Sequence, residues 1–90
     1  MSKKLAVVIR KRQSEALRMS IGLILMDDTV EIFIINHKLK HTERSALIIE
    51  TIQEMEMNIY SNIVQGDEVT YISMPDMAEK LLTYDHVLAY

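Results

Sequence analysis

The chain alternates between short apolar runs and longer amphipathic segments. The first run, residues 4–10, places five apolar residues in succession between a lysine and an arginine. A strand with one face in water alternates apolar and polar residues, so this unbroken run indicates a strand that is covered on both faces. Runs rich in β-branched, aromatic or other apolar residues at 30–35, 58–64, 69–73 and 86–90 predict four further strands.

Two helices are predicted between the first three strands. Ser14 is a good N-cap residue, and the apolar residues after it recur with helical spacing until about Met26. The acidic pair that follows, Asp27 and Asp28, would oppose the dipole at a helix C-terminus and so marks the end of this helix. The second helix is predicted to begin at Thr42, and its apolar stripe consists of Ile48, Ile49, Ile52 and Met55.

A third helix is predicted between the fourth and fifth strands. Ser73 and Asp76 have the spacing of a capping box, and Pro75 suits a first helical turn. We expect its apolar face to be formed by Met77, Ala78, Leu81 and Leu82.

The predicted order, βαβαββαβ, indicates an α/β fold with a mainly parallel sheet. Each helix is long enough to connect parallel strands, and right-handed crossovers then give a small doubly wound sheet with residues 4–10 in its interior. The link at 65–68 is too short for a crossover helix. The strands on either side of it form either a hairpin or a parallel pair with a short extended link, and the parallel arrangement fits the rest of the pattern better.

Composition and charge narrow the class of protein. Ninety residues, 49% of them hydrophobic, predict one ordered domain, and the absence of cysteine excludes disulfides and thiol chemistry in this chain. No apolar run approaches membrane-spanning length, so we expect a cytoplasmic protein with no membrane partner. The net charge of −3 argues against nucleic-acid binding, although residues 1–44 carry +4 and residues 45–90 carry −7.

Basic and polar side chains follow three of the predicted strands. Because ligands of open α/β sheets bind at the carboxyl ends of the strands, these segments predict a pocket for an anion or a docking patch for an acidic partner. The start of each of the first two helices adds backbone N–H groups there. Exposed lysine and arginine in loops are equally consistent with a solubilising role. The candidate anion- or partner-binding residues are Arg10, Lys11, Arg12, Ser14, His37, Lys38, Lys40, His41, Ser61 and Asn62.

Several known kinds of site lack their residues here. The first strand is followed by neither a Ser/Thr/Gly-rich flavin-phosphate loop nor the acidic residues of a receiver domain, and the two glycines form no dinucleotide-binding loop. His37 and His41 could share a helical face, but Lys38 and Lys40 would repel a cation and no third ligand is evident. No nucleophile elbow is present. We therefore expect no metal site, no cofactor and no catalytic residue.

The ordered segments together resemble the DsrE/DsrF/DsrH-type sulfur-relay family, nearest to its small DsrH/TusB-type subunits. The features that carry the resemblance are the strand at 5–10, the Asp27-Asp28 entry to the second strand, the Ile59-Tyr60 strand and the run at 69–73 with its helix and last strand. The resemblance implies a flavodoxin-like three-layer sandwich and assembly into homo- or hetero-oligomers. It also implies, for catalytic members, a persulfide-carrying cysteine at the carboxyl end of a strand.

The sequence departs from that family at the decisive position. Residues 60–62 hold Tyr-Ser-Asn, and a serine cannot hold a persulfide. The helix that relatives place between the third and fourth strands is also missing. Two functions therefore remain open: a cysteine-free subunit or adaptor that docks a cysteine-bearing DsrE-type relative or a sulfur carrier, and a stand-alone protein that binds a small anion or nucleotide. An apolar last strand with no helix after it and seven methionines favour self-association.

Overall fold

The computed structural model describes residues 3–11, 13–24, 29–39, 43–55, 57–66 and 69–90, with residues 14, 23, 24 and 43–45 described by their backbone. Five strands form one sheet in the order β4-β3-β2-β1-β5, and every neighbouring pair is parallel. The strands are β1 (Lys4–Ile9), β2 (Thr29–Ile34), β3 (Ile59–Ser61), β4 (Thr70–Tyr71) and β5 (His86–Ala89). The predicted α/β class and parallel sheet are confirmed.

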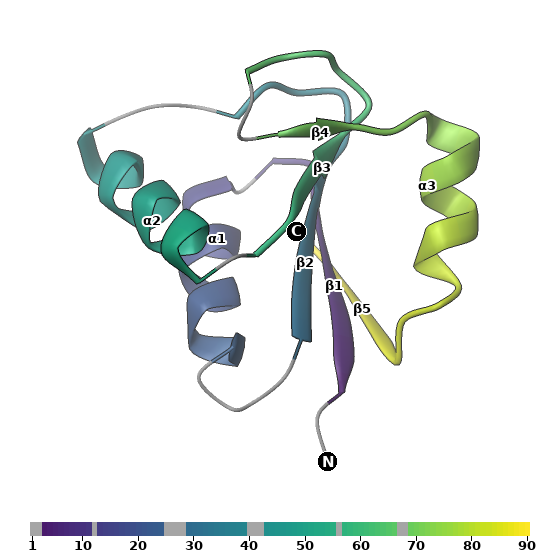
Figure 1. Cartoon of the computed structure of the whole chain (residues 1–90), viewed down its shortest axis with the longest axis horizontal. Coiled ribbons are helices and arrows are strands. Elements are labelled where there is room, and N and C mark those ends of the chain that lie inside the picture. The colour runs from purple at the N-terminus through teal and green to yellow at the C-terminus, as the bar shows by residue number, and fades with distance from the viewer. Residues whose placement is uncertain (1–2, 12, 25–28, 40–42, 56, 67–68) are drawn as a thin grey trace.

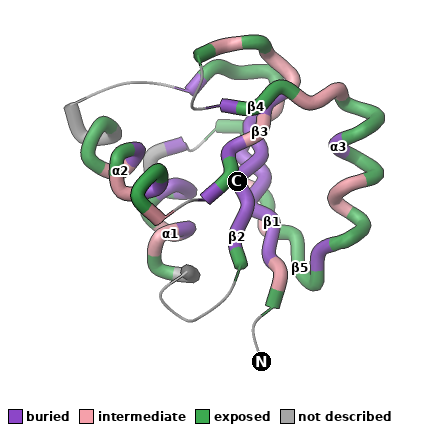
Figure 2. Tube along the Cα trace, viewed as in Figure 1, coloured by how far each residue is buried: buried purple, intermediate pink, exposed green. Residues whose placement is uncertain are grey.

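β1 lies inside the sheet, as its unbroken apolar sequence predicts. It pairs with β2 on one side, where Lys4 stands opposite Thr29, and with β5 on the other, where Leu5 stands opposite His86. Figure 2 shows the resulting buried band along the middle strands. A strand in this position needs apolar side chains on both faces, because helices cover both faces of a parallel sheet.

Three helices cover the two faces of the sheet (Figure 1). The helices α1 (Gln13–Ile24) and α2 (Glu43–Glu54) lie on one face, and α3 (Met74–Leu81) lies on the other. The chain steps from β1 to β4 in one direction and then returns past β1 to β5, so connections of one hand place α3 on the opposite face. The result is a small flavodoxin-like three-layer sandwich.

The apolar core is divided by the sheet. Alternate residues of β1 and β2, such as Val7 and Ile32, pack under α1 and α2, where Leu17 and Ile52 meet them. The other residues of the same strands belong to a smaller cluster under α3, which consists of Ala6, Val8, Phe33, Met77 and Tyr84. Both faces of β1 are therefore buried without any residue of the strand being polar between Leu5 and Ile9.

The short link between β3 and β4 connects two parallel strands, which confirms the arrangement that the sequence favoured. Ser61 stands opposite Tyr71 in this pair, and the Ile72 N–H donates to the Ser61 carbonyl at 2.9 Å. A three-residue strand is only about 10 Å long, so a few extended residues can return to its starting level without a helix. Both strands are shorter than the runs 58–64 and 69–73 predict. β3 ends at Ser61, where the chain turns and Oγ accepts a hydrogen bond from the Ile63 N–H at 3.1 Å.

The predicted start of α3 is confirmed, whereas the predicted start of α1 is not. Ser73 caps α3, since its Oγ accepts a hydrogen bond from the Asp76 N–H at 3.3 Å and Pro75 lies in the first turn. α1 begins at Gln13, so the backbone of Ser14 lies inside the helix and the predicted N-cap at Ser14 is wrong. The side chain of Ser14, the predicted helix end near Met26 and the predicted start at Thr42 lie outside the described residues.

The apolar face predicted for α3 is wrong in two positions. Met77 and Leu81 face the sheet, but Ala78 is exposed and Leu82 has 85% of its surface exposed. A helix of eight residues that meets the sheet along one narrow line can bury only residues four apart. Within the described residues, no helix is long and apolar enough to cross a membrane.

Candidate functional site

The carboxyl edge of the sheet carries a cleft made of two hollows. The larger, of about 380 Å³, is lined by Arg10, Lys11, Ile35, Asn36, His37 and Met74. The smaller, of about 210 Å³, is lined by Arg10, Lys11, Gln13 and His37. Three basic side chains therefore line both hollows, and we call the whole the carboxyl-edge cleft.

Two of these basic residues stand where β1 ends. Arg10 and Lys11 are exposed, but their backbone N–H groups donate to the carbonyl of Tyr90 at 2.6 and 3.3 Å. These bonds join the exit of β1 to the residue that follows β5. The backbone of both residues is therefore fixed while their cationic side chains stay in contact with water.

The third basic residue is placed by a sharp bend after β2. Asn36 has a φ of 61°, in the left-handed region that asparagine tolerates better than most residues. Its N–H donates to Oδ1 of Asn62 at 2.7 Å, and Nδ2 of Asn62 donates to Oδ1 of Asn36 at 2.8 Å. The paired asparagines join the exits of β2 and β3 and direct the chain so that His37 follows at the cleft.

Side-chain amides also hold the loop after His37. Nε2 of the buried Gln13 donates to the carbonyl of Lys38 at 2.9 Å, and Oε1 of Gln65 accepts from the Leu39 N–H at 2.7 Å. Gln65 also donates from Nε2 to the carbonyl of Ile63 at 3.2 Å. The first bond links this loop to the start of α1, and the second links it to the segment after β3. Hydrogen bonds between side chains and backbone therefore hold the loops around the cleft in place, and no ligand is needed to form them.

The structure brings together three of the ten predicted site residues in the cleft: Arg10, Lys11 and His37. Lys38 is exposed, and its carbonyl accepts the hydrogen bond from Gln13. Ser61 is fully buried, and its Oγ donates to the His37 carbonyl at 3.3 Å. Ser61 and Asn62 therefore hold loops that form the cleft. The predictions for Arg12, Lys40, His41 and the side chain of Ser14 lie outside the described residues.

Four lining residues were not among the predicted site residues: Gln13, Ile35, Asn36 and Met74. The sequence does hold a signal for Asn36, because asparagine tolerates the left-handed backbone better than most residues and this one directly follows the predicted strand at 30–35. Met74 could have been found from topology alone. Once β4 is parallel, the segment after it must also emerge at the carboxyl edge.

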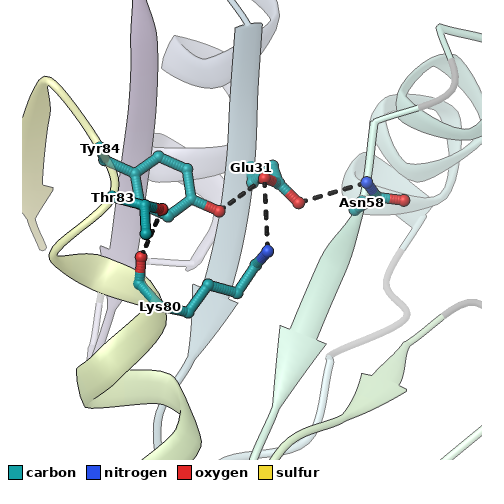
Figure 3. Close-up of polar contacts among 5 residues, drawn as sticks. All are labelled: Glu31, Asn58, Lys80, Thr83 and Tyr84. Atoms are coloured by element: carbon teal, nitrogen blue, oxygen red, sulfur yellow. Dashed lines mark hydrogen bonds and ion pairs between the residues drawn. The ribbon is translucent and has the colours of Figure 1, made fainter.

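A second polar cluster lies on the α3 face, around a buried carboxylate on β2 (Figure 3). The Tyr84 hydroxyl donates to Oε1 of Glu31 at 2.6 Å, and Nδ2 of Asn58 donates to Oε2 at 3.2 Å. Nζ of Lys80 lies 4.0 Å from Oε1 and 5.3 Å from the centroid of the Tyr60 ring. Because each polar group here already has a partner within the cluster, we assign it to the attachment of α3 to the sheet.

The pKa values in this cluster follow from burial and hydrogen bonding. Desolvation raises the pKa of Glu31, but hydrogen bonds from Tyr84, Tyr60 and Asn58 and the charge of Lys80 outweigh it, so the pKa is lowered overall. Desolvation and the bond to Glu31 raise the pKa of Tyr60 to about 12 and raise that of Tyr84 as well. At neutral pH the cluster thus holds an ionised Glu31 and neutral tyrosines.

The residues that line the cleft could donate hydrogen bonds to an anion. Guanidinium, ammonium and imidazole groups donate to carboxylate, phosphate or sulfur oxyanions, and Gln13 and Asn36 add amide groups beside them. Within the described part of the chain, no group of three or more His, Cys, Asp or Glu residues is placed to hold a metal ion.

Comparisons with known proteins add no assignment. No protein-family model matches the chain, and no curated protein or solved structure matches it. The resemblance to the DsrE/DsrF/DsrH-type family therefore stays a prediction from the sequence.

Proposed function

We propose that this chain is a non-catalytic binding subunit that takes an anionic group into the carboxyl-edge cleft. The observation that carries this proposal is that Arg10, Lys11 and His37 line both hollows. The hollows stand at the carboxyl ends of parallel strands, where ligands of open α/β sheets bind. Arg10 and Lys11 in the cleft would attract an anion even though the chain as a whole carries a net charge of −3.

The family resemblance suggests what carries the anion. In that interpretation the chain is an adaptor of a sulfur-relay assembly, and the cleft docks an acidic group of a cysteine-bearing DsrE-type relative or of a sulfur carrier. The absence of cysteine from the chain supports an adaptor over a carrier, because a sulfur carrier needs a thiolate. The structural use of Ser61 Oγ, which bonds the His37 carbonyl and the Ile63 N–H, supports the same choice.

A free small anion is the second candidate. The larger hollow, at about 380 Å³, is within the range of small-molecule sites, roughly 300 to 1,000 Å³. It is lined by residues that follow β1 and β2 and by Met74 at the start of α3. No partner chain is needed to form it. This observation favours a ligand that enters the cleft as a separate molecule.

A phosphate titration tests the anion site. We expect inorganic phosphate, followed by amide chemical shifts, to perturb residues around Arg10 and His37, and Arg10→Ala to weaken binding by about tenfold because a charge-assisted hydrogen bond is lost. Binding should also weaken with added salt. Arg18→Ala, which removes an exposed arginine from α1, is the matched control and should bind phosphate as the parent does.

The same pair of variants tests docking. A cysteine-bearing DsrE-type protein from the same organism should co-purify with the parent and with Arg18→Ala, but less with Arg10→Ala. Thermal stability of Arg10→Ala should stay within about 0.5 kcal/mol of the parent, since the side chain is exposed. Unaltered binding together with a large loss of stability would make Arg10 a structural residue and would remove the proposed site.

A further inference from the structure

The two hollows of the carboxyl-edge cleft differ in the residues that they do not share. The larger hollow adds Ile35, Asn36 and Met74 to the shared basic residues, whereas the smaller adds only Gln13. Because Arg10, Lys11 and His37 line both, the two hollows are neighbours. Only the larger hollow is lined by apolar residues, Ile35 and Met74, which we call the apolar wall.

The apolar wall comes from two elements that are far apart in the sequence. Ile35 follows β2 and is half-buried against the cluster under α3, and Met74 opens α3 with 45% of its surface exposed. A methionine side chain is flexible and polarisable, so it adapts to a ring or chain placed against it. Covering this surface with an apolar group removes it from water and favours binding.

We propose that the carboxyl-edge cleft binds a small molecule in which an anionic group is joined directly to an apolar ring or short aliphatic body. The anionic group pairs with Arg10, Lys11 and His37, and the body lies against Ile35 and Met74. This proposal rests on the proposed anion-binding function and specifies its ligand class. A bare inorganic anion leaves the apolar wall in water, and a neutral apolar molecule gains nothing from the cations.

The size and rigidity of the cleft limit the ligand further. A volume of about 380 Å³ is near the lower end of small-molecule sites, so the body is one ring or a chain of similar bulk. The loops that carry Ile35 and His37 are held without a ligand, because the Asn36–Asn62 pair and the Gln13–Lys38 bond join them to neighbouring segments. Such preorganisation lowers the entropic cost of binding and favours ligands that match its shape.

Three probes separate the two contributions. We expect phenyl phosphate to bind about tenfold more tightly than inorganic phosphate, because its ring covers the apolar wall. Benzyl alcohol has a similar body without the charge and should not bind at the same concentrations. Calorimetry or amide chemical shifts on the whole chain measure all three, and the shifts should reach Ile35 and Met74 only with phenyl phosphate.

A substitution in the apolar wall tests the assignment of the body. Met74→Gln keeps the length of the side chain but makes it polar, so it should remove the preference for phenyl phosphate while leaving inorganic phosphate binding unchanged. Leu47→Gln makes the same kind of change at a leucine of α2 that is 70% exposed and does not line the cleft. This control should keep the full preference.

The outcomes distinguish this inference from the function on which it rests. Equal binding of phosphate and phenyl phosphate, or a preference that survives Met74→Gln, overturns the inference and leaves the anion site intact. If neither probe binds but Arg10-dependent docking of a DsrE-type protein persists, the anion belongs to a partner and the small-molecule ligand is rejected. If neither phosphate nor phenyl phosphate binds and Arg10→Ala does not weaken docking of the DsrE-type protein, both proposals fail.

Discussion

Glu31 is the residue at which burial and charge conflict most sharply. It lies on β2 between apolar neighbours and is buried, yet its pKa is lowered, so it stays ionised at neutral pH. A buried carboxylate is tolerated only when its oxygens accept hydrogen bonds, and Tyr84 and Asn58 each donate one to a different oxygen. Phe33 completes the cluster, stacked on Tyr60 with centroids 5.1 Å apart and edge-on to Tyr84 at 5.7 Å.

Removing the Tyr84 hydroxyl should destabilise the fold at neutral pH. Tyr84→Phe takes away a donor at 2.6 Å and leaves an oxygen of a buried charge less satisfied, which costs about 1 to 3 kcal/mol of unfolding free energy. Urea unfolding followed by circular dichroism measures this loss. Tyr71→Phe removes the same hydroxyl from an exposed tyrosine of β4 and should change stability by less than about 0.5 kcal/mol.

The pH dependence of that loss has a definite sign. The folded pKa of Glu31 lies below its ordinary value of 4.5, so its contribution to stability is present above about pH 4.5 and is lost as the pH falls through the folded pKa. Tyr84→Phe raises the folded pKa toward 4.5 and therefore weakens this dependence. The difference between parent and variant should shrink in acid, and a difference that grows below pH 4 would contradict the assigned role.

At the scale of elements, α3 is the shortest of the three described helices and covers its face of the sheet without a second described helix beside it. It is eight residues long, begins at the Ser73 cap and meets the sheet through Met77 and Leu81. Lys80, which directly precedes Leu81, adds an ion pair with Glu31. The start of this helix also supplies Met74 to the cleft, so its position on the sheet affects the shape of the candidate site.

One buried side chain should account for much of the attachment of α3. Met77→Ala should lower the unfolding free energy by about 2 to 5 kcal/mol, because it leaves a cavity under the helix. Leu82→Ala removes an apolar side chain of similar size that is 85% exposed and should change stability by less than about 0.5 kcal/mol. Denaturant unfolding compares the two. Equal effects would place Leu82 in the core, as the sequence pattern wrongly predicted.

At the scale of the whole molecule, the sheet ends in two strands of different character. β4 has two residues, whereas β5 has four and presents a row of backbone groups on the side away from β1. Strands at the edges of sheets are commonly protected by lysine, proline or a bulge. The sequence of β5, His-Val-Leu-Ala, includes neither of those residue types, and its Val87 is 47% exposed.

We expect this edge to pair with a second copy of the chain. Sedimentation at micromolar concentration should report a dimer or larger species, and Val87→Lys should shift it toward the monomer, because a charge at an edge strand opposes pairing. Leu82→Lys places the same charge at an exposed leucine that lies before β5 and should leave the assembly unchanged. A monomer throughout the concentration range, or equal effects of both lysines, would contradict assembly through β5.

The sequence by itself determined the elements and their class. Unbroken apolar runs require cover on both faces, so β1 could be placed inside a parallel sheet, and the Ser73 cap could be located because capping depends on residues a few positions apart. The presence of Arg10, Lys11 and His37 at one edge followed from the same logic, since the carboxyl ends of parallel strands meet there. These conclusions depend on local periodicity and on topology.

Only the tertiary structure decided which side chains meet. The Asn36–Asn62 and Gln13–Lys38 bonds join residues more than twenty positions apart, and no local pattern encodes such pairs. Leu81 packs against the sheet while Leu82 is exposed, because α3 meets the sheet along a narrow line. The ionised state of Glu31 depends on Tyr84, which lies 53 positions away. Distances and burial are properties of packed surfaces, so they arise only when the elements are brought together.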